Sequence, residues 1–419
     1  MQLVAYGAQD IYLTGNPMIT YFKVVYRRHT NFAMESIEQT FNGSVGFGNR
    51  VSALISRNGD LINGVVLEAT LPAAGTGKAW IQNVGHYLMR EVIVEIGGQQ
   101  IDKHYGDWLE IWSQLTIPAG QKAGYLEMIG QSPTDLIGQV TGFQNRAAQA
   151  TGKIYVPLQF WFCRNVGLAL PLIALQYHEV KITIQFEELS KLTSTAATGL
   201  SLSASLWVDY IYLDTDERRR FAQVSHEYLI EQLQYTGDEV SPVADSTVSP
   251  SLSFNHPVKE LIWVCRETDN RLANYTTAVS GTYQAPITDA TAVTYTVITN
   301  AAAINDTRPT GGINPVASAR LQLNGHDRMA TRSGSYYNLV QCKNHHTNIP
   351  TSPGINVYSF ALKPEDHQPS GTCNFSRIDN AKLTLTGNAG AGAGVLKIFA
   401  VNYNVLRIMS GMGGLAYSN

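Results

Sequence analysis

The sequence predicts an all-β protein made of two tandem antiparallel sandwiches or jelly rolls, each with eight strands. Three observations carry this prediction. Short runs alternate between apolar and polar residues, turn signals separate them every ~8 to 12 residues, and the motif order of the first half recurs in the second. At 419 residues the chain is too long for one hydrophobic core, so two domains are expected.

A charged stretch near the middle of the chain predicts the boundary between the two units. Residues 206–213 alternate as a strand does, and the chain then carries Asp214, Asp216, Glu217 and a run of three arginines at 218–220. Such a run is too charged to bury. Alternation resumes at 227–235, and Gly237 is expected to end it. We therefore expect an N-terminal arm at 1–30, a first jelly roll at 31–214, a linker at 215–225, and a second jelly roll with a C-terminal tail at 226–419.

The first half contains the clearest element signals. The arm is expected to be irregular, because Gly7, Gly15 and the Asn16-Pro17 pair interrupt it. Between residues 108 and 152 apolar residues recur three and four apart, which predicts an insertion of short helices. Strands are predicted at 37–41, 51–55, 65–71, 92–96, 154–162, 180–187 and 202–213.

The second half repeats the order of these motifs. VEIGGQQI at 94–101 is answered by LQLNGHDR at 321–328, VPLQFWF at 156–162 by VYSFALK at 357–363, and YHEVKITI at 177–184 by IDNAKLTL at 378–385. The strand that begins at 206 is matched by KIFAVNYNVL from 397. Several pairs in the same order indicate a duplicated β domain, of which the first copy carries the helical insertion.

Composition narrows the function classes. Charged residues are 15% of the chain, against roughly 25% in an average soluble domain, and the net charge is −3. A chain without a basic face is not expected to bind nucleic acid directly. No secretion signal and no apolar run long enough to span a membrane is seen, so we expect synthesis in the cytoplasm. Four widely spaced cysteines are expected to be free thiols in a reducing compartment: Cys163, Cys265, Cys342 and Cys373.

No arrangement of residues predicts a catalytic centre, cofactor or metal. A metal-binding jelly roll needs two histidines one residue apart, and none of the ten histidines fits; the nearest pair, His345-His346, would point to opposite faces of a strand. The glycine turn at 75–78 lacks the spacing of a phosphate loop. The glycine runs at 390–394 and 411–414 are expected to be a hairpin and part of the tail.

Three acid–imidazole neighbours are expected to make structural hydrogen bonds only. They are Asp102-Lys103-His104, His178-Glu179 and His226-Glu227, and neither HExxH nor a nucleophile elbow accompanies them. Four asparagines head N-x-S/T sequons and are candidate glycosylation sites: Asn42, Asn274, Asn305 and Asn374. Because Asn274 and Asn305 lie in long polar loops, an N-glycan is expected between residues 270 and 314.

Seven long motifs identify a family resemblance that spans the whole chain. The chain is similar to the major capsid proteins of chloroviruses and related large double-stranded DNA viruses. The motifs are YGAQDIYLTGNP at Tyr6, FKVVYRRHTNFA at Phe22, ISRNGDLI at Ile55, GLALPLIALQYHEVK at Gly167, RFAQVSHEYLIEQLQ at Arg220, PSGTCNFSRIDNA at Pro369 and YNVLRIMSGMGGLAY at Tyr403.

The resemblance implies a double jelly roll, three copies of which form a nearly hexagonal capsomer. These homotrimers would tile the icosahedral outer capsid of the virion, assembled in the host cytoplasm. Because the tyrosine-rich arm before Thr30 has no obvious place in either sandwich, we expect it at the capsomer base. The implied partners are neighbouring capsomers, minor capsid proteins, attached glycans, and an internal membrane that lies nearby without being spanned. On this reading the chain is not an enzyme.

Two alternatives remain open from the residues alone. One is a carbohydrate-binding or carbohydrate-active tandem β-sandwich protein, in which an enzyme would need paired carboxylates in a cleft. The other is a metal-dependent tandem jelly-roll enzyme, which would need the missing histidine pair.

Overall fold

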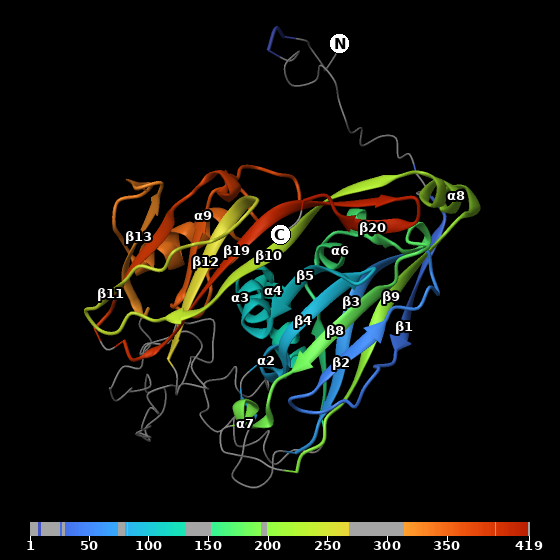
Figure 1. The fold of residues 1–419 in the computed structure, drawn as a ribbon, viewed down its shortest axis with the longest axis horizontal. Helices are drawn as coiled ribbons and strands as arrows, with labels where there is room; N and C mark the ends of the chain where they lie inside the picture. The colour runs from blue at the N-terminus through green and yellow to red at the C-terminus, as the bar shows by residue number, and fades with distance from the viewer. Residues whose placement is uncertain are drawn as a thin grey trace, which may run out of the picture.

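The structure is a computed structural model, and it describes residues 7–9, 26, 30–73, 80–81, 83–130, 152–193, 199–267, 314–389 and 391–417. The described residues form antiparallel sheets with few short helices, which together make a double jelly roll. Figure 1 shows the first unit in blue to green beside the second in yellow to red, with α3 (Gly106–Thr116) and α4 (Ala119–Met128) between them. The predicted all-β tandem fold is confirmed.

The first jelly roll packs two sheets face to face, ordered β1-β9-β3-β6 and β2-β8-β4-β5, with the short β7 paired to β3. In β3, Val65, Leu67 and Ala69 are buried while the residues between them are half-buried, because successive side chains of a strand point to opposite faces. The strands are β1 (Phe32–Gln39), β2 (Arg50–Leu54), β3 (Leu61–Leu71), β4 (Met89–Ile96), β5 (Gln99–Tyr105), β6 (Gly152–Pro157), β7 (Leu170–Pro171), β8 (Val180–Phe186) and β9 (Ser203–Leu213).

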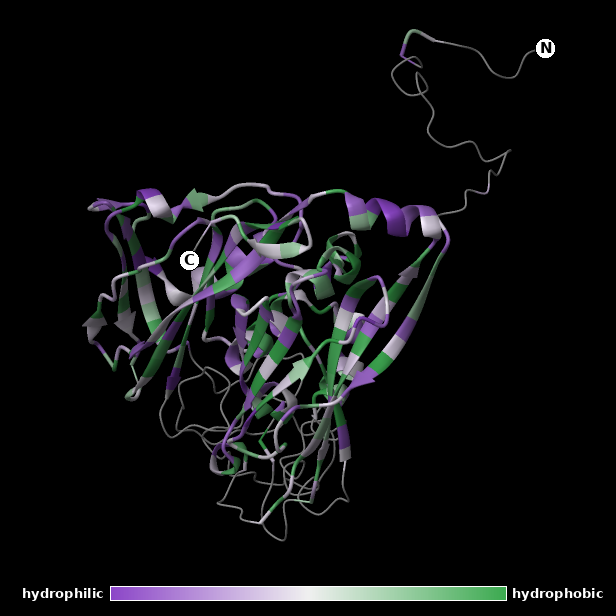
Figure 2. Cartoon of the chain, turned by 45° about the vertical axis from the view of Figure 1, so that its right-hand side comes forward, coloured by the Kyte–Doolittle hydropathy of each residue, from purple (hydrophilic) through white to green (hydrophobic). Residues whose placement is uncertain are grey.

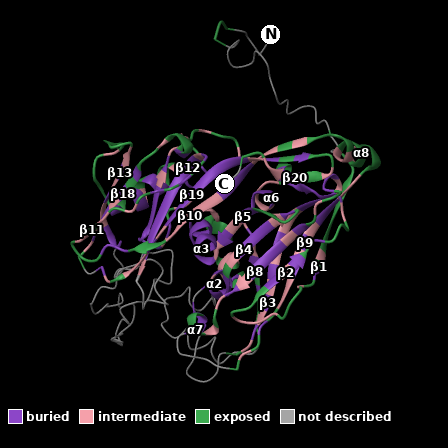
Figure 3. Cartoon of the chain, viewed as in Figure 1, coloured by how far each residue is buried: buried purple, intermediate pink, exposed green. Residues whose placement is uncertain are grey.

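The second jelly roll has sheets ordered β10-β19-β12-β16 and β11-β18-β13-β14, with β17, β20 and β15 paired beside these paths. Figures 2 and 3 show that the strands of both units carry apolar residues and are largely buried. The strands are β10 (His226–Val240), β11 (Thr247–Val248), β12 (Pro257–Glu267), β13 (Val316–Leu323), β14 (His326–Asp327), β15 (Arg332–Ser333), β16 (Ile355–Ser359), β17 (Cys373–Asn374), β18 (Ala381–Gly387), β19 (Gly394–Met409) and β20 (Met412–Leu415).

The two strand orders coincide position by position, which confirms the motif pairs found in the sequence. The hairpin β4-β5 corresponds to β13-β14, β6 to β16, β8 to β18 and β9 to β19. Even the tight turns agree, since Gly97 and Gly98 have φ of 58° and 82°, and Asn324 and Gly325 have φ of 52° and 79°. Positive φ at both central residues is typical of the hairpin turn that matches the twist of the strands.

Short helices interrupt the sheets, and the predicted insertion is confirmed as far as residue 128; residues 131–151 lie outside the described part. The second copy also carries an unexpected helical segment between β15 and β16, formed by η4 (Tyr336–Gln341) and α9 (Cys342–His345). No helix in the described ranges is long and apolar enough to cross a membrane. The helices are α2 (Val84–Leu88), α3 (Gly106–Thr116), α4 (Ala119–Met128), α6 (Trp161–Arg164), α7 (Leu189–Leu192), α8 (Thr215–Gln223), η4 (Tyr336–Gln341), α9 (Cys342–His345), and the 3₁₀ turns η2 (Val166–Leu168), η3 (Leu172–Ala174) and η5 (Phe375–Arg377).

Three sequence predictions are wrong in detail. The strand predicted at 154–162 ends at Pro157, which has no N–H to donate, and the aromatic residues after it turn into the first core as α6. Gly237 does not end β10; it has φ of 100° and lies in a bulge after which the strand continues to Val240. The glycine run at 390–394 is not a hairpin, because β18 and β19 belong to different sheets.

The charged joint after β9 is an exposed helix, α8 (Figure 3). Asp214 caps it, accepting a hydrogen bond from the backbone N–H of Thr215 at 2.7 Å. Arg218 reaches back to the first jelly roll, where its Nε and Nη2 each lie 3.0 Å from an oxygen of Asp60. The joint is therefore held on the first sandwich by a two-point ion pair.

Candidate functional site at the junction of the two jelly rolls

Helix α3, inserted in the first jelly roll, packs its apolar face onto the outer face of the second. Its side chains form one buried cluster with residues of β12, β16 and β19. Burying a large apolar side chain contributes about 1.5–3 kcal/mol, so this contact is a major part of the junction. The α3 residues of the cluster are Trp108, Ile111, Trp112 and Leu115, and those of the second unit are Ile262, Val264, Cys342, Ile355, Val357, Phe399 and Val401.

A buried polar network fixes the other side of α3 to α2. The Glu110 carboxylate accepts hydrogen bonds from Asn83 Nδ2 at 2.9 Å and Gln114 Nε2 at 2.8 Å, and lies 2.6 Å from His86 Nδ1. Tyr125 of α4 meets His86 Nε2 at 2.8 Å. Burial alone would raise the pKa of Glu110, but the bonds from His86, Gln114 and Asn83 lower it, so the carboxylate stays ionised.

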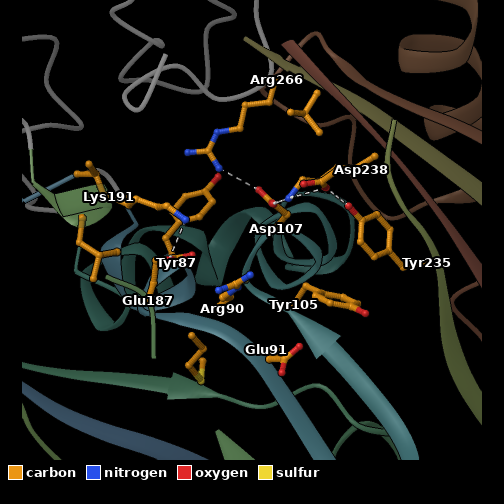
Figure 4. A pocket seen from close by; sticks show the side chains of 16 residues that line it. Tyr87, Arg90, Glu91, Tyr105, Asp107, Glu187, Lys191, Tyr235, Asp238 and Arg266 are labelled. Carbon is orange, nitrogen blue, oxygen red and sulfur yellow. Dashed lines mark hydrogen bonds and ion pairs between the residues drawn. The ribbon is translucent and has the colours of Figure 1, made fainter. Parts of the chain in front are cut away.

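Charged side chains from both jelly rolls meet around a cavity of about 670 Å³ (Figure 4). Asp107, at the start of α3, lies 2.6 Å from Lys397 Nζ of β19 and 3.3 Å from Arg266 Nη1 of β12. Burial disfavours the charged form of Lys397, but the nearby Asp107 raises its pKa above the usual value. These ion pairs connect the two sandwiches at the cavity. Their role is to hold the two sandwiches together.

A second charge cluster lies deeper in the junction. Glu231 of β10 pairs with Arg164 of α6 at 3.0 Å and with Lys259 of β12 at 2.7 Å. The Lys259 side chain is fully buried, and burial lowers its pKa although Glu231 opposes this shift. The Arg164 guanidinium also stacks over the Trp112 ring at 4.8 Å. The cluster therefore joins one residue of the first jelly roll to two of the second.

The β19-β20 hairpin of the second jelly roll docks on the first through glycines. His178 Nδ1 lies 2.9 Å from the carbonyl oxygen of Gly413, and the backbone N–H of Tyr177 donates to the Gly411 carbonyl at 3.0 Å. A Cβ on Gly413 would come within 2.6 Å of Leu175, so only glycine allows this close approach. The glycine run at 411–414 was predicted as part of the tail. In the structure it belongs to the β19-β20 hairpin, which packs against the first sandwich.

The acid–imidazole neighbours make the structural hydrogen bonds expected of them. Asp102 lies 2.9 Å from His104 and accepts a hydrogen bond from the backbone N–H of Leu233 in the second jelly roll. His226 bonds the carbonyl of Phe221, and His178 bonds the hairpin as described. The structure does not bring these three groups together. The glycine turn at 75–78 lies outside the described residues.

The strand geometry considered for His345-His346 does not apply, because His345 ends helix α9 and His346 is its C-cap. His346 is buried between two carboxylates, with Nε2 at 3.0 Å from Glu260 and Nδ1 at 2.9 Å from Glu365. Burial alone would lower its pKa, but Glu260 and Glu365 raise it to about 9. Sequence reasoning missed this cluster, as it missed Glu110 and Glu231, because the partners are far apart along the chain.

Two of the four glycosylation candidates can be placed. Asn42 is exposed and its backbone bridges to Ser52, while Asn374 is exposed but its side chain accepts a hydrogen bond from the backbone N–H of Ser376 at 3.0 Å. Asn274 and Asn305 lie outside the described residues. None of the four cysteines forms a disulfide with another, and Cys265 and Cys342 are buried.

The strand order of the two sandwiches, braced by an inserted helix, places the chain among the double jelly-roll proteins. Two family models match the chain: one described as the major capsid protein N-terminus covers residues 20–214, and one described as the large eukaryotic DNA virus major capsid protein covers residues 217–414. The chain belongs to this major capsid protein family.

Relatives and solved structures agree with this assignment. The chain is 52% identical to the major capsid protein of Pyramimonas orientalis virus and 48% identical to that of Paramecium bursaria Chlorella virus 1, in both cases over 100% of this chain and 99% of the relative. A quasi-atomic model of the PBCV-1 virus capsid matches with 43% identity and a TM-score of 0.79, covering 96% of this chain and 100% of that one. The Faustovirus major capsid protein, 15% identical, shares the fold with a TM-score of 0.72, over 96% of this chain and 94% of that one.

Proposed function

We propose that this chain is a major capsid protein, the structural subunit from which homotrimeric, pseudo-hexagonal capsomers form and tile the icosahedral shell of a large double-stranded DNA virus. The observation that carries the proposal is the identical strand order of the two jelly rolls in one chain. A trimer of such a chain presents six similar wedges around its axis. It can therefore meet six neighbours through near-equivalent contacts, which a trimer of single sandwiches cannot do.

The junction supports this role, because a subunit that packs against six neighbours must keep its two jelly rolls in a fixed relative orientation. The α3 cluster, the Glu231 cluster and the glycine hairpin hold the two sandwiches in one orientation. A low charge content also suits extensive contacts between subunits, since obligate interfaces bury roughly 2,000 Å² or more and are apolar at their centres.

The same proposal sets the domain division and the partners. Residues 31–214 and 226–419 are the two jelly rolls, 215–225 the linker, and 1–30 an arm at the capsomer base. The partners are neighbouring capsomers, minor capsid proteins and an internal membrane that is approached but not spanned. Assembly takes place in the host cytoplasm, and the assembled protein forms the outer capsid of the virion. The chain has no enzymatic activity.

Native mass measurement of the purified protein tests this function. We expect a stable species of three times the 45.9 kDa chain mass. A monomer or a two-fold dimer at capsid-forming concentrations would contradict the proposal and favour the carbohydrate-binding alternative.

Glycan attachment is a separate part of the proposal. We propose an N-glycan between residues 270 and 314, with Asn42 the better acceptor of the two placed candidates because no described contact occupies its exposed side chain. Peptide mass spectrometry of virion material should find the loop peptide modified. An unmodified loop would refute this part and leave the assembly role standing.

A further inference from the structure

An exposed apolar patch surrounds the tip of the β19-β20 hairpin. Met409 and Met412 form the last pair of the hairpin ladder and are 51% and 53% exposed. Tyr177 lies against the tip, since a Cβ on Gly411 would come within 2.6 Å of its ring, and it is 75% exposed. The glycines of the hairpin face the first jelly roll, whereas the two methionines remain accessible.

Val224 extends the patch from a different direction. It is 53% exposed and precedes by two residues His226, which pairs with Ile408 at the end of the same hairpin strand. The ladder begins at His226, so Val224, the C-cap of α8, lies near this end of β19. We call Tyr177, Val224, Met409 and Met412 the tip patch. Methionine and tyrosine adapt to varied partners, and contiguous exposed apolar groups of this kind mark interaction sites.

The N-terminal arm joins the body at the same end of the molecule. Asn31 Nδ2 lies 3.5 Å from Asp214, the cap of α8, and α8 ends at Gln223 directly before Val224. A nine-residue helix spans about 13 Å at ~1.5 Å per residue. Figure 1 shows α8 and β20 at this end. The point at which the arm joins the body and the tip patch therefore lie at the same end of the molecule.

The composition of the arm complements the patch. Residues 1–29 include the apolar stretches DIYLTG and MITYFKVVY, and their charged residues are Asp10 against Lys23, Arg27 and Arg28. Exposed Glu179 lies two residues from Tyr177, whereas Glu227 beside the patch is already paired with Arg407. Fully extended, 29 residues reach up to ~100 Å at ~3.3–3.6 Å per residue, which is enough to cross to an adjacent subunit.

Tyr26, one of the described residues of the arm, leaves its side chain 93% exposed. We propose that the tip patch is the docking site for the N-terminal arm of a neighbouring copy of this chain. The inference rests on the assembly role proposed above and adds the surface and the segment through which subunits are tied together at the capsomer base.

Photo-crosslinking of the full-length oligomer tests this proposal. A benzoylphenylalanine replaces Met412, and a matched control replaces Leu362, which is 72% exposed and lies outside the tip patch. We expect the Met412 probe to give a product of two chain masses on a denaturing gel, with peptides of residues 1–29 joined to the probe. The double variant Met409→Ser/Met412→Ser, probed at Tyr177 instead, should lower this yield about tenfold while the melting temperature stays unchanged.

Several results would overturn the proposal. They are cross-links only within one chain, cross-links to residues outside 1–29, or a yield no higher than that of the Leu362 control. Native mass of the same sample separates two kinds of failure. A monomer contradicts the assembly role itself, whereas a trimer without arm cross-links contradicts only the docking site.

Discussion

The two jelly rolls share one strand order but use their helical insertions differently. In the first, α3 leaves the sandwich after β5 and packs Trp108 and Trp112 on the sheet of the second. In the second, the η4-α9 segment stays largely with its own sandwich, where Tyr337 lies in the core and its hydroxyl donates to the Ala319 carbonyl at 3.0 Å.

This difference shows how a duplicated domain becomes a single rigid unit. The strands keep the shared framework, while the insertions have diverged so that one of them reaches across. The junction therefore depends on α3 far more than on its counterpart, and variants in the two insertions should have unequal effects.

The largest expected effect comes from truncating α3. Trp108→Ala should destabilise the protein by about 3–5 kcal/mol, because it opens a cavity in the cluster between the jelly rolls. We also expect calorimetry to resolve two unfolding transitions where the native protein shows one. The matched control, Val340→Ala in η4, is 43% exposed and should change stability by no more than about 0.5 kcal/mol. Equal losses for the two variants would contradict the comparison.

Glu231→Ala should cost about 3 kcal/mol, because it leaves the buried Lys259 ammonium without its carboxylate partner. Denaturant unfolding measures the loss. Glu227→Ala, four residues earlier on β10, removes an exposed pair with Arg407 and should cost about 0–1 kcal/mol. If both losses were below 1 kcal/mol, the charge cluster would not brace the junction.

The second jelly roll should be the more sensitive to alkali. Its His346 has a pKa of about 9 in the folded state, against 6.5 for a free histidine, because Glu260 and Glu365 hold it protonated. Its stabilisation is therefore complete below pH ~6.5 and is lost as the pH rises through about 9, at about 1.4 kcal/mol per pKa unit. The free energy of unfolding should fall over this range, and His346→Gln should flatten the dependence. An unchanged profile in the variant would exclude His346 as its source.

The smallest expected effect concerns the glycine hairpin. Gly411→Ala places a side chain at φ of 80° and against the Tyr177 ring, whereas Gly237→Ala meets only the strain of φ of 100° in open space. Backbone strain should lower the free energy of unfolding of both variants by about 1 kcal/mol. The clash with Tyr177 should lower that of Gly411→Ala further. Thermal melts that rank them in the opposite order would argue against the close docking of the hairpin.

The framework could be predicted from the sequence because it depends on local signals. Alternation in 206–213 and 180–187 reports a half-buried strand directly, and the turn residues at 97–98 and 324–325 fix the hairpins. The recurring order of these signals was enough to identify β6 and β16, and likewise β8 and β18, as equivalent strands of the two halves.

The junction could not be predicted, because its contacts join residues far apart along the chain. Asp107 and Lys397 are separated by 290 positions, and nothing near either residue signals the other. Spacing in α3 indicated a helix but not which surface it would cover. The glycines at 411–414 indicated a turn, whereas their role in close docking depends on Leu175 and His178 of the other jelly roll.

Electron microscopy of the purified protein tests the central claim most directly. If two equivalent jelly rolls are fixed side by side in each chain, the particle should contain three chains and show a nearly six-fold outline in projection along its axis. A triangular particle with three equal lobes, or a single chain whose two halves vary in relative orientation, would contradict this account.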